Sequence, residues 1–457
     1  MFEDDVWSMI QQENMFLEDS RVLAAVSGGA DSVCLFHVLR HLSVRAGFTL
    51  HVAHLHHMLR QSADEDERFV RQLCLDHGIG LSVHRVDVAD VARRRGQSVE
   101  EAGRSERLAF LEQTAMQEGC SRVALGHHLD DQAETILQNL LRGAGSNGLG
   151  GMRPVRDLWC RPLLGVGKRE IVDWLKAQGY TWREDETNRE EICNRNRIRH
   201  RLVPLLQEFN PRITAHLAEL GTVMKAEHDY LDEQMRRFAA DHLDHWGTHC
   251  VRIRVEALEQ CPPALRFRLW MECYRLLTGR GLERRYVLDL EADFRGPRSG
   301  LGLPGNVMMG IRKTWMVCYT TKSQRQDYRF VLEGPGAVNV LSGLQLDVSL
   351  VSSHEGVNLI AEDTGRCVVV DGAQAPWPWV IRAPLAKDGF IPSGSNRYAS
   401  LRKMFGDRGL PGSIRHAMPV CCDGEGQVFW AGGLRMADRV RVGPATKQFI
   451  RIRVCSC

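Results

Sequence analysis

The stretch Val22-Leu-Ala-Ala-Val-Ser-Gly-Gly-Ala-Asp-Ser32 decides the fold of this chain. Its five apolar residues, 22–26, precede a Gly-rich turn and predict a short strand that is buried on both faces. From Ser32 to Leu42 the apolar residues recur at helical spacing. A strand, a Ser-Gly-Gly turn and a helix therefore follow one another, and several backbone N–H groups gather around one small concavity.

This turn is suited to binding phosphate. Gly28 and Gly29 let the backbone approach an anion without an intervening side chain, while Ser27 and Ser32 carry hydroxyl groups. The helix dipole adds partial positive charge at the same place. Asp31 would repel a phosphate unless a cation lay between them, so its presence predicts magnesium. The alternative is that the Asp and Ser side chains only cap the helix.

The composition indicates an ordinary globular protein of two or three domains. The chain has 457 residues and a formal net charge of +2, so its overall charge does not indicate a partner. Its 14 cysteines are scattered and include no C-x-x-C pair, which favours reduced thiols. No apolar run approaches the length of a membrane span, and the acidic segment 1–20 is unlike a secretion signal. We therefore expect a cytoplasmic protein that does not bind membranes.

Strand and helix patterns alternate four times in the first part of the chain. Capping boxes at Ser62–Glu65 and Ser98–Glu101 predict the starts of two of the helices. This alternation predicts an α/β fold with a doubly wound parallel sheet, in which ligands collect at the carboxyl ends of the strands. The predicted strands are 22–26, 48–55, 81–86 and 121–126.

The segment Gly126-His-His-Leu-Asp-Asp-Gln-Ala-Glu-Thr135 follows the fourth predicted strand. If a helix begins near Leu129, then Asp131, Glu134 and Thr135 share one face, and His127 and Asp131 face the phosphate loop. A zinc site and a merely polar helix start are the alternatives. Carboxylates beside a phosphate loop favour magnesium–nucleotide chemistry.

Two stretches are locally basic in a nearly neutral chain. Residues 195–212 contain five Arg residues and one acid, and residues 432–457 contain six basic residues and one acid. Clustered arginine is typical of a surface that binds a phosphate backbone, whereas a solvated charged helix normally mixes signs. The tail is either a nucleic-acid contact or an unpaired charged edge. A Gly-rich segment, 141–151, carries Arg142 and is a lid, a substrate-contacting loop or a long connection.

Later segments predict a mostly helical domain and then a small α+β domain. Residues 212–290 are rich in Ala, Leu and charged residues, while residues 329–370 alternate apolar and polar side chains. We expect a catalytic domain at 1–212, a helical nucleic-acid- or substrate-binding domain at 213–320 and a β-rich region at 329–457. Residues from about 380 to 457 would form a nucleic-acid-binding domain.

The loop SGGADS resembles the pyrophosphate loop (PP-loop) of the ATP pyrophosphatase superfamily, which has a Rossmann-like fold. Together with GHHLDDQAETILQNLLRGAG and REDETNREEICNRNRIRHRLVPLL, it resembles the tRNA(Ile)-lysidine synthetase family. The segment HLHHMLR (54–60) and the pair Arg104 and Arg107 also match. The chain departs from the family pattern at His56, where Asp is usual, and at Leu108, where Tyr is usual.

The resemblance implies an ATP-dependent ligase that forms a C–N bond. ATP adenylates the wobble cytidine of tRNA(Ile) with a CAU anticodon, and free L-lysine then attacks carbon 2, so that the lysidine formed changes codon reading from AUG to AUA. The family is compatible with a homodimer. The alternative is a PP-loop tRNA thiolase that uses a scattered thiol such as Cys193.

The residues expected in the site follow from the loop, the helix after the fourth strand and the basic segment. ATP would bind at Ser27, Gly28, Gly29, Ala30, Asp31 and Ser32. The catalytic residues would be Asp31, Arg107, His127 and Asp131, with Mg²⁺ on Asp31 and Asp131 and with His127 or Asp131 as the base. The residues that contact tRNA would be Arg142, Arg195, Arg197, Arg199 and Arg201.

Overall fold

The computed structural model describes residues 2–59, 63–183, 194–246, 249–296, 300–321, 327–341, 344–352 and 366–456. The chain divides into two compact units, Met1–Asp229 and Tyr230–Cys457, each of which is described by itself. Ser62 of one predicted capping box, most of the motif at 183–188 and Cys193 lie outside the described residues. Within the described residues, no helix has the length and apolar character that crossing a membrane requires.

The first unit is built on a six-stranded sheet with the order β3-β2-β1-β4-β6-β5. The predicted parallel sheet is confirmed, because β1 pairs in parallel with both β2 and β4, and β2 pairs in parallel with β3. A short hairpin, β5 and β6, extends the β4 edge. The bounds are β1 Arg21–Ala25, β2 Thr49–His56, β3 Gly80–Arg85, β4 Arg122–Ala124, β5 Val155–Arg156 and β6 Trp159–Cys160.

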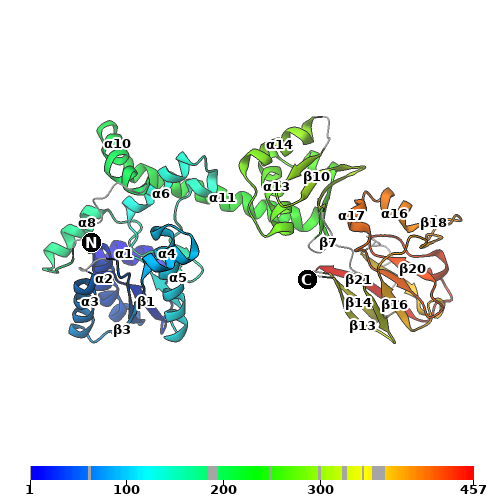
Figure 1. The fold of residues 1–457 in the computed structure, drawn as a ribbon, viewed down its shortest axis with the longest axis horizontal. Helices are drawn as coiled ribbons and strands as arrows, with labels where there is room; N and C mark the ends of the chain where they lie inside the picture. The colour runs from blue at the N-terminus through cyan, green and yellow to red at the C-terminus, as the bar shows by residue number, and fades with distance from the viewer. Residues whose placement is uncertain are drawn as a thin grey trace. The chain divides into compact units, whose positions relative to one another are not determined.

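Helices cover both faces of this sheet, as a doubly wound fold requires (Figure 1). Alternate residues of β1 explain why the strand is apolar throughout. Val22 and Ala24 pack with α2 (Ala30–Ala46), α1 (Phe2–Gln12), α3 (Ala63–Asp76) and α8 (Lys168–Ala177). Leu23 packs on the opposite face with Leu111 of α5 (Val99–Gln117). Next to α5 lies α4 (Val88–Arg95), which the sequence pattern does not predict.

The second predicted capping box is present at the start of α5. Glu101 N donates to Ser98 Oγ at 3.2 Å, and Ser98 N donates to Glu101 Oε2 at 3.1 Å. These two bonds satisfy backbone donors that a helix start otherwise leaves exposed, so the helix begins where the sequence indicates.

The Gly-rich segment is a connection fixed to α6 (Leu129–Leu141), and it contains the short helix α7 (Ser146–Leu149). Asn139 Nδ2 donates to the carbonyl oxygen of Gly148 at 2.8 Å. Gln132 donates to the carbonyl oxygen of Met152 at 3.1 Å and accepts from its N–H at 2.7 Å. Side chains of α6 therefore hold the second half of this segment, as expected of a structured connection, and the lid and the substrate-contacting loop stay alternatives.

The basic segment is helical but irregular. Helix α9 (Asn194–Arg197) continues into a π-helical turn, Ile198–Leu202, and then into α10 (Val203–Phe209). The π-turn adds a residue to one helical turn of this basic segment. Helix α11 (Ile213–His242) follows and spans the boundary between the two units.

The second unit begins with helices packed on a five-stranded antiparallel sheet, β7-β8-β11-β10-β9. The strands β7 and β8 lie inside a segment whose composition predicts helix, and they were missed because each is short. The helices are α12 Val255–Gln260, α13 Pro263–Thr278 and α14 Arg284–Arg295. The strands are β7 Leu243–Trp246, β8 Cys250–Arg254, β9 Leu301–Leu303, β10 Val307–Arg312 and β11 Trp315–Thr320.

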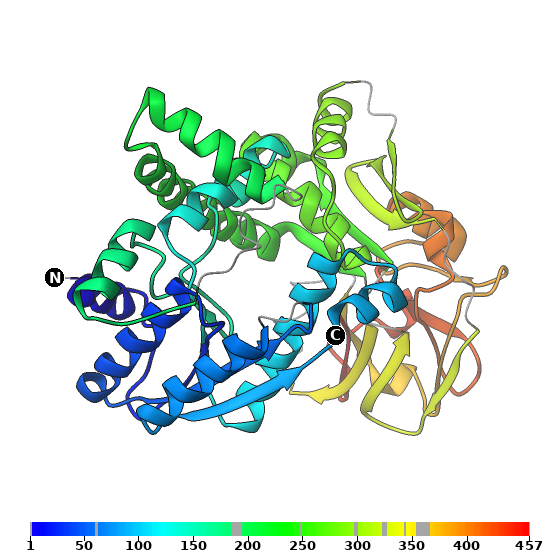
Figure 2. The same ribbon diagram turned by 60° about the vertical axis from the view of Figure 1, so that its left-hand side comes forward.

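The remainder of the second unit is β-rich, as the alternation after residue 329 predicts (Figure 2). One sheet has the order β12-β16-β19-β20, another has the order β13-β14-β21-β15, and β17 pairs with β18. Two short helices, α16 Leu401–Asp407 and α17 Gly412–Arg415, complete it. The strands are β12 Arg329–Leu332, β13 Gly336–Leu341, β14 Leu344–Val351, β15 Cys367–Asp371, β16 Trp379–Arg382, β17 Gly389–Phe390, β18 Ala399–Ser400, β19 Val420–Cys422, β20 Val428–Ala431 and β21 Phe449–Ser456.

The basic tail is not an unpaired edge. Its strand β21 pairs with β14 on one side and with β15 on the other, so it is a central strand. Strands from before and after residue 380 also share both larger sheets, since β12 pairs with β16 and β14 with β21. The three-domain division of the chain stays a prediction.

Candidate active site

The loop between β1 and α2 folds around the hydroxyl group of Ser32. The N–H groups of Ser27 and Gly28 donate to Ser32 Oγ at 3.1 and 3.2 Å, and Ser32 Oγ donates to the carbonyl oxygen of Gly29 at 2.9 Å. Gly28 has a φ of +98°, in the left-handed region that favours glycine. Ala30 is the buried first residue of α2. The loop therefore gathers backbone N–H groups and two hydroxyls at the positive end of a helix.

Gly126 brings the end of β4 against the start of α2. A Cβ atom at this position would lie only 3.1 Å from the carbonyl oxygen of Asp31. The strand order reverses between β1 and β4, so this contact marks the switch point of the sheet. The two predicted motifs, after β1 and after β4, are therefore neighbours.

A pocket of about 510 Å³ opens at this edge of the sheet. It is lined by residues from the ends of β1, β2 and β4 and from α5. Among the described residues, no cysteine lines it. The polar lining residues include Ser27, Asp31, Ser32, His54, Arg107 and His127.

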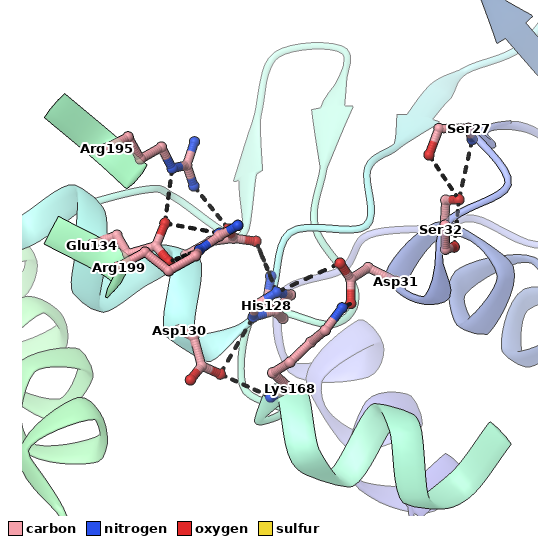
Figure 3. Close-up of polar contacts among 11 residues, drawn as sticks. Ser27, Asp31, Ser32, His128, Asp130, Glu134, Lys168, Arg195 and Arg199 are labelled. Carbon is pink, nitrogen blue, oxygen red and sulfur yellow. Dashed lines mark hydrogen bonds and ion pairs between the residues drawn. The ribbon is translucent and has the colours of Figure 1, made fainter. Parts of the chain in front are cut away.

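Asp31 meets two basic groups. Lys168 Nζ lies 2.5 Å from Asp31 Oδ1, and His128 Nε2 lies 3.7 Å from Asp31 Oδ2. Figure 3 shows Lys168 reaching Asp31 from the start of α8, which also has its first N–H group bonded to Asp130 Oδ2 at 2.8 Å. The carboxylate of Asp31 is therefore neutralised by groups that a bound cation can replace.

Asp131 lies on the far side of His128. Its Oδ2 accepts the backbone N–H of His128 at 3.1 Å, and its Oδ1 accepts from Arg195 at 2.8 Å and from Arg199 at 3.0 Å. Glu134, only 3% exposed, accepts from Arg195 Nε at 2.9 Å and from Arg199 Nε at 2.5 Å (Figure 3). Two arginines of the basic segment thus neutralise two buried acids of α6.

The two adjacent histidines are in opposite electrostatic environments. Burial, with nearby guanidinium groups such as those of Arg161 and Arg195, lowers the pKa of His127 to about 3. The Nδ1 atom of His127 is buried and has no hydrogen-bond partner among the described residues. Burial also disfavours the charged form of His128, but the surrounding carboxylates outweigh this and raise its pKa. At neutral pH, His127 is therefore the neutral imidazole of the pair.

We expect histidine NMR to separate these two side chains. The ring signals of His127 should stay those of neutral imidazole from pH 8 down to pH 5, whereas His128 should titrate above the ordinary value of about 6.5. Because its folded pKa is raised, protonation of His128 stabilises the fold fully below about pH 6.5 and loses that effect as the pH rises through the folded value. His127→Gln and His128→Gln variants assign the signals. The interpretation is wrong if both rings titrate together near 6.5.

Comparisons with known proteins give the family. A family model described as the PP-loop domain matches residues 3–206. The tRNA(Ile)-lysidine synthase of Geobacter sulfurreducens is 31% identical over 455 residues, which cover 97% of this chain and 95% of that protein. This chain belongs to the tRNA(Ile)-lysidine synthase family.

A second curated relative agrees with this assignment. The synthase of Clostridium acetobutylicum is 28% identical and is covered for 99% of both chains. Among solved structures, a U34-tRNA thiolase of Methanococcus maripaludis with an iron–sulfur cluster has 14% identity and a TM-score of 0.42, covering 49% of this chain and 78% of that one. As a lysidine synthase family member, the chain is a ligase that forms a C–N bond, and its PP-loop domain uses ATP.

The structure accounts for one of the two departures from the lysidine synthase pattern. His56 Nδ1 accepts the backbone N–H of Met58 at 3.2 Å, and His56 Nε2 lies 3.4 Å from Asp64 Oδ1. The Nδ1 lone pair thus accepts a turn N–H group that a carboxylate could also accept. Nothing in the structure explains Leu108.

The basic residues predicted to bind tRNA fall into two groups. Arg195 and Arg199 point to α6, as described above. Arg142, Arg197 and Arg201 are exposed and line a second pocket of the first unit. Arg107 is exposed, lines the first pocket and has no acidic partner among the described residues.

Four polar residues of this site were not among the predicted site residues. The motif after β4 contains three of them, His128, Asp130 and Glu134. In that motif, only His127 and Asp131 were expected to face the phosphate loop. Lys168 is separated from Asp31 by 137 positions. The sequence indicates only that Lys168 begins a helix, α8, which follows the short strand β6.

Proposed function

We propose that this chain joins L-lysine to carbon 2 of the wobble cytidine of a tRNA(Ile) with a CAU anticodon, through an adenylated cytidine. Membership of the family, whose named relatives are tRNA(Ile)-lysidine synthases, supports the substrates. The observation that carries the chemistry is the pocket in which the N–H-rich loop, Arg107 and His127 converge.

In the first step, oxygen 2 of the cytidine attacks the α-phosphorus of ATP and pyrophosphate leaves. Ser27, Gly28 and Ser32 would cradle the leaving group once Ser32 Oγ releases the two N–H groups that it now accepts. Lys168 would move from Asp31 to the phosphates, and Arg107 would meet the charge that develops in the transition state. Each of these groups is positively charged or donates hydrogen bonds, as the chemistry requires.

Magnesium fits at Asp31 in this arrangement. Mg²⁺ is usually held by one or two carboxylates together with phosphate oxygens, and Asp31 offers one carboxylate beside the phosphate loop. When bound, the ion neutralises charge on the phosphates. Asp131 is less available, because its two oxygens already accept bonds from His128, Arg195 and Arg199. Its role as a second ligand stays a prediction and requires those arginines to withdraw.

In the second step, the lysine ε-amine attacks carbon 2 and AMP leaves with oxygen 2. The ammonium form of lysine is no nucleophile, so a proton must first be lost. We favour His127 as the base, because its ring is neutral at pH 7 and its Nδ1 has no partner among the described residues. Bound phosphates add negative charge nearby and raise its pKa toward the range where imidazole takes up a proton.

Thiol chemistry has no support among the described residues. None of the described cysteines lines the pocket. Cys34 is the cysteine nearest in sequence to the phosphate loop, and burial raises its pKa, which disfavours the reactive thiolate.

We expect pyrophosphate release to require a wobble cytidine. With ATP and magnesium, the chain should release pyrophosphate in the presence of a CAU-anticodon tRNA(Ile) transcript. A transcript with uridine at the wobble position should give only background, because uracil lacks the amino group whose lone pair helps to carry charge on the adenylated ring. A colorimetric pyrophosphate assay measures both. Equal release with the two transcripts would contradict the proposal.

A further inference from the structure

The first unit has a second pocket, of about 440 Å³, that shares no lining residue with the first. It lies between the carboxyl end of α6 and the segment from α9 through the π-turn to α10. Its volume falls in the range of about 300–1,000 Å³ that is typical of small-ligand sites. The residues that line it are Gln138, Leu141, Arg142, Arg197, Ile198, Arg201, Leu202 and Leu205.

The pocket is cationic. Three of its lining residues are arginines, and none of its described lining residues is acidic. Arg142 and Arg197 have no acidic partner within the described part of the chain. This differs from Arg195 and Arg199 on the same segment, which are paired with α6 acids. The spacing explains the contrast, because 195 and 199 share one helical face while 197 and 201 share another.

The pocket also has an apolar lining. Ile198 is buried, whereas Leu141 and Leu205 are 69% and 49% exposed. Exposed large aliphatic side chains grouped beside the guanidinium groups of Arg142 and Arg197 indicate a binding surface. An aliphatic surface accepts the flat face of a base, and guanidinium groups accept the adjoining phosphate or stack on the base. An acidic peptide would pair with the arginines but would leave the apolar lining of the pocket without a matching group.

We propose that this pocket binds an unstacked nucleotide of a single-stranded loop of the RNA substrate, with the base on the leucines and the phosphate on the arginines. The proposal rests on the proposed function, since it assumes that the substrate is an RNA. The bound nucleotide is not the reactive one. The catalytic residues lie at the start of α6 and this pocket at its end, and 13 residues of helix span about 20 Å. The pocket therefore binds a nucleotide of the loop other than the wobble cytidine.

Two kinds of variant test the two halves of the pocket. Arg142→Gln and Arg197→Gln each remove one positive charge. Leu205→Asp disrupts the apolar lining of the pocket at an exposed position. Arg169→Gln is the matched control, since Arg169 is highly exposed on α8 and pairs only weakly with Asp173. Binding to an anticodon stem–loop RNA is measured across salt concentrations, first with the intact loop and then with a single abasic nucleotide moved along it.

The proposal predicts that each arginine variant lowers the magnitude of the salt slope by about one and weakens RNA binding, with the KM for ATP unchanged. At one loop position, the abasic change should weaken wild-type binding about five- to thirtyfold, because apolar surface of the nucleobase and the leucines is no longer buried. The same abasic change should weaken the binding of the Leu205→Asp variant only slightly further. The proposal is wrong if the variants behave as Arg169→Gln does, or if the abasic effects add to Leu205→Asp at every position. These binding results are independent of product formation, so a chain that binds the stem–loop but makes no lysidine would refute the proposed function and not the pocket.

Discussion

Replacing Asp31 by Asn should lower pyrophosphate release by about 100- to 1,000-fold, the loss expected when one group that stabilises transition-state charge is removed. Asp31 follows the phosphate loop directly and pairs with Lys168 at 2.5 Å. Its removal would leave magnesium without its carboxylate ligand and Lys168 without the partner that positions it. Pyrophosphate release with saturating ATP and tRNA measures the effect.

Asp173→Asn is the control for this prediction. Asp173 is an exposed acid on the same helix as Lys168, and it lies 3.7 Å from Arg169. Its loss should leave the rate within a factor of two or so, because exposed ion pairs contribute little. Binding of tRNA should be kept in both variants. Wild-type turnover in Asp31→Asn would remove this residue from the catalytic machinery.

Glu134→Gln should reduce the free energy of unfolding by about 2–4 kcal/mol, since it leaves two guanidinium groups facing only one carboxylate. Glu134 is 3% exposed and bonds both Arg195 and Arg199. A loss of this size lowers the melting temperature of a unit of about 200 residues by about 2–4 °C per kcal/mol. Differential scanning calorimetry of the full chain measures the change in the transition of the first unit.

Glu118→Gln is the matched control, because the Glu118 side chain is 32% exposed and pairs at the surface with Arg21. Its cost should stay below about 1 kcal/mol. The Glu134→Gln/Arg199→Gln double variant should cost less than the sum of its two single variants, because both changes remove the same contact. Additive costs would show that these residues do not act as one network.

The central part of the fold was predictable because its signals are local. The apolar run before Ser27 and the Gly-rich turn after it specify a strand and a helix start within a dozen residues. Motifs after two parallel strands then meet at one sheet edge, as the close approach of Gly126 to Asp31 confirms. The start of α6 at Leu129 follows from the same kind of pattern.

What the sequence could not show depends on pairs of residues far apart in the chain. Lys168 reaches Asp31 across 137 positions, and Arg195 reaches Glu134 across 61. The run of arginines looks uniformly basic because its acidic partners lie on α6. Two faces of this helical segment then divide the arginines between an internal network and a surface pocket, and a local count of charges contains neither fact.

The most direct test of the account is the transfer of lysine itself. The chain is incubated with ATP, magnesium, radiolabelled lysine and a CAU-anticodon tRNA(Ile) transcript, and the labelled nucleoside is isolated from the tRNA. The account predicts that label enters the tRNA only when ATP is present, that one AMP forms for each lysine incorporated, and that the label is on the wobble cytidine. ATP-dependent AMP formation without lysine, accompanied by sulfur in the tRNA, would contradict it.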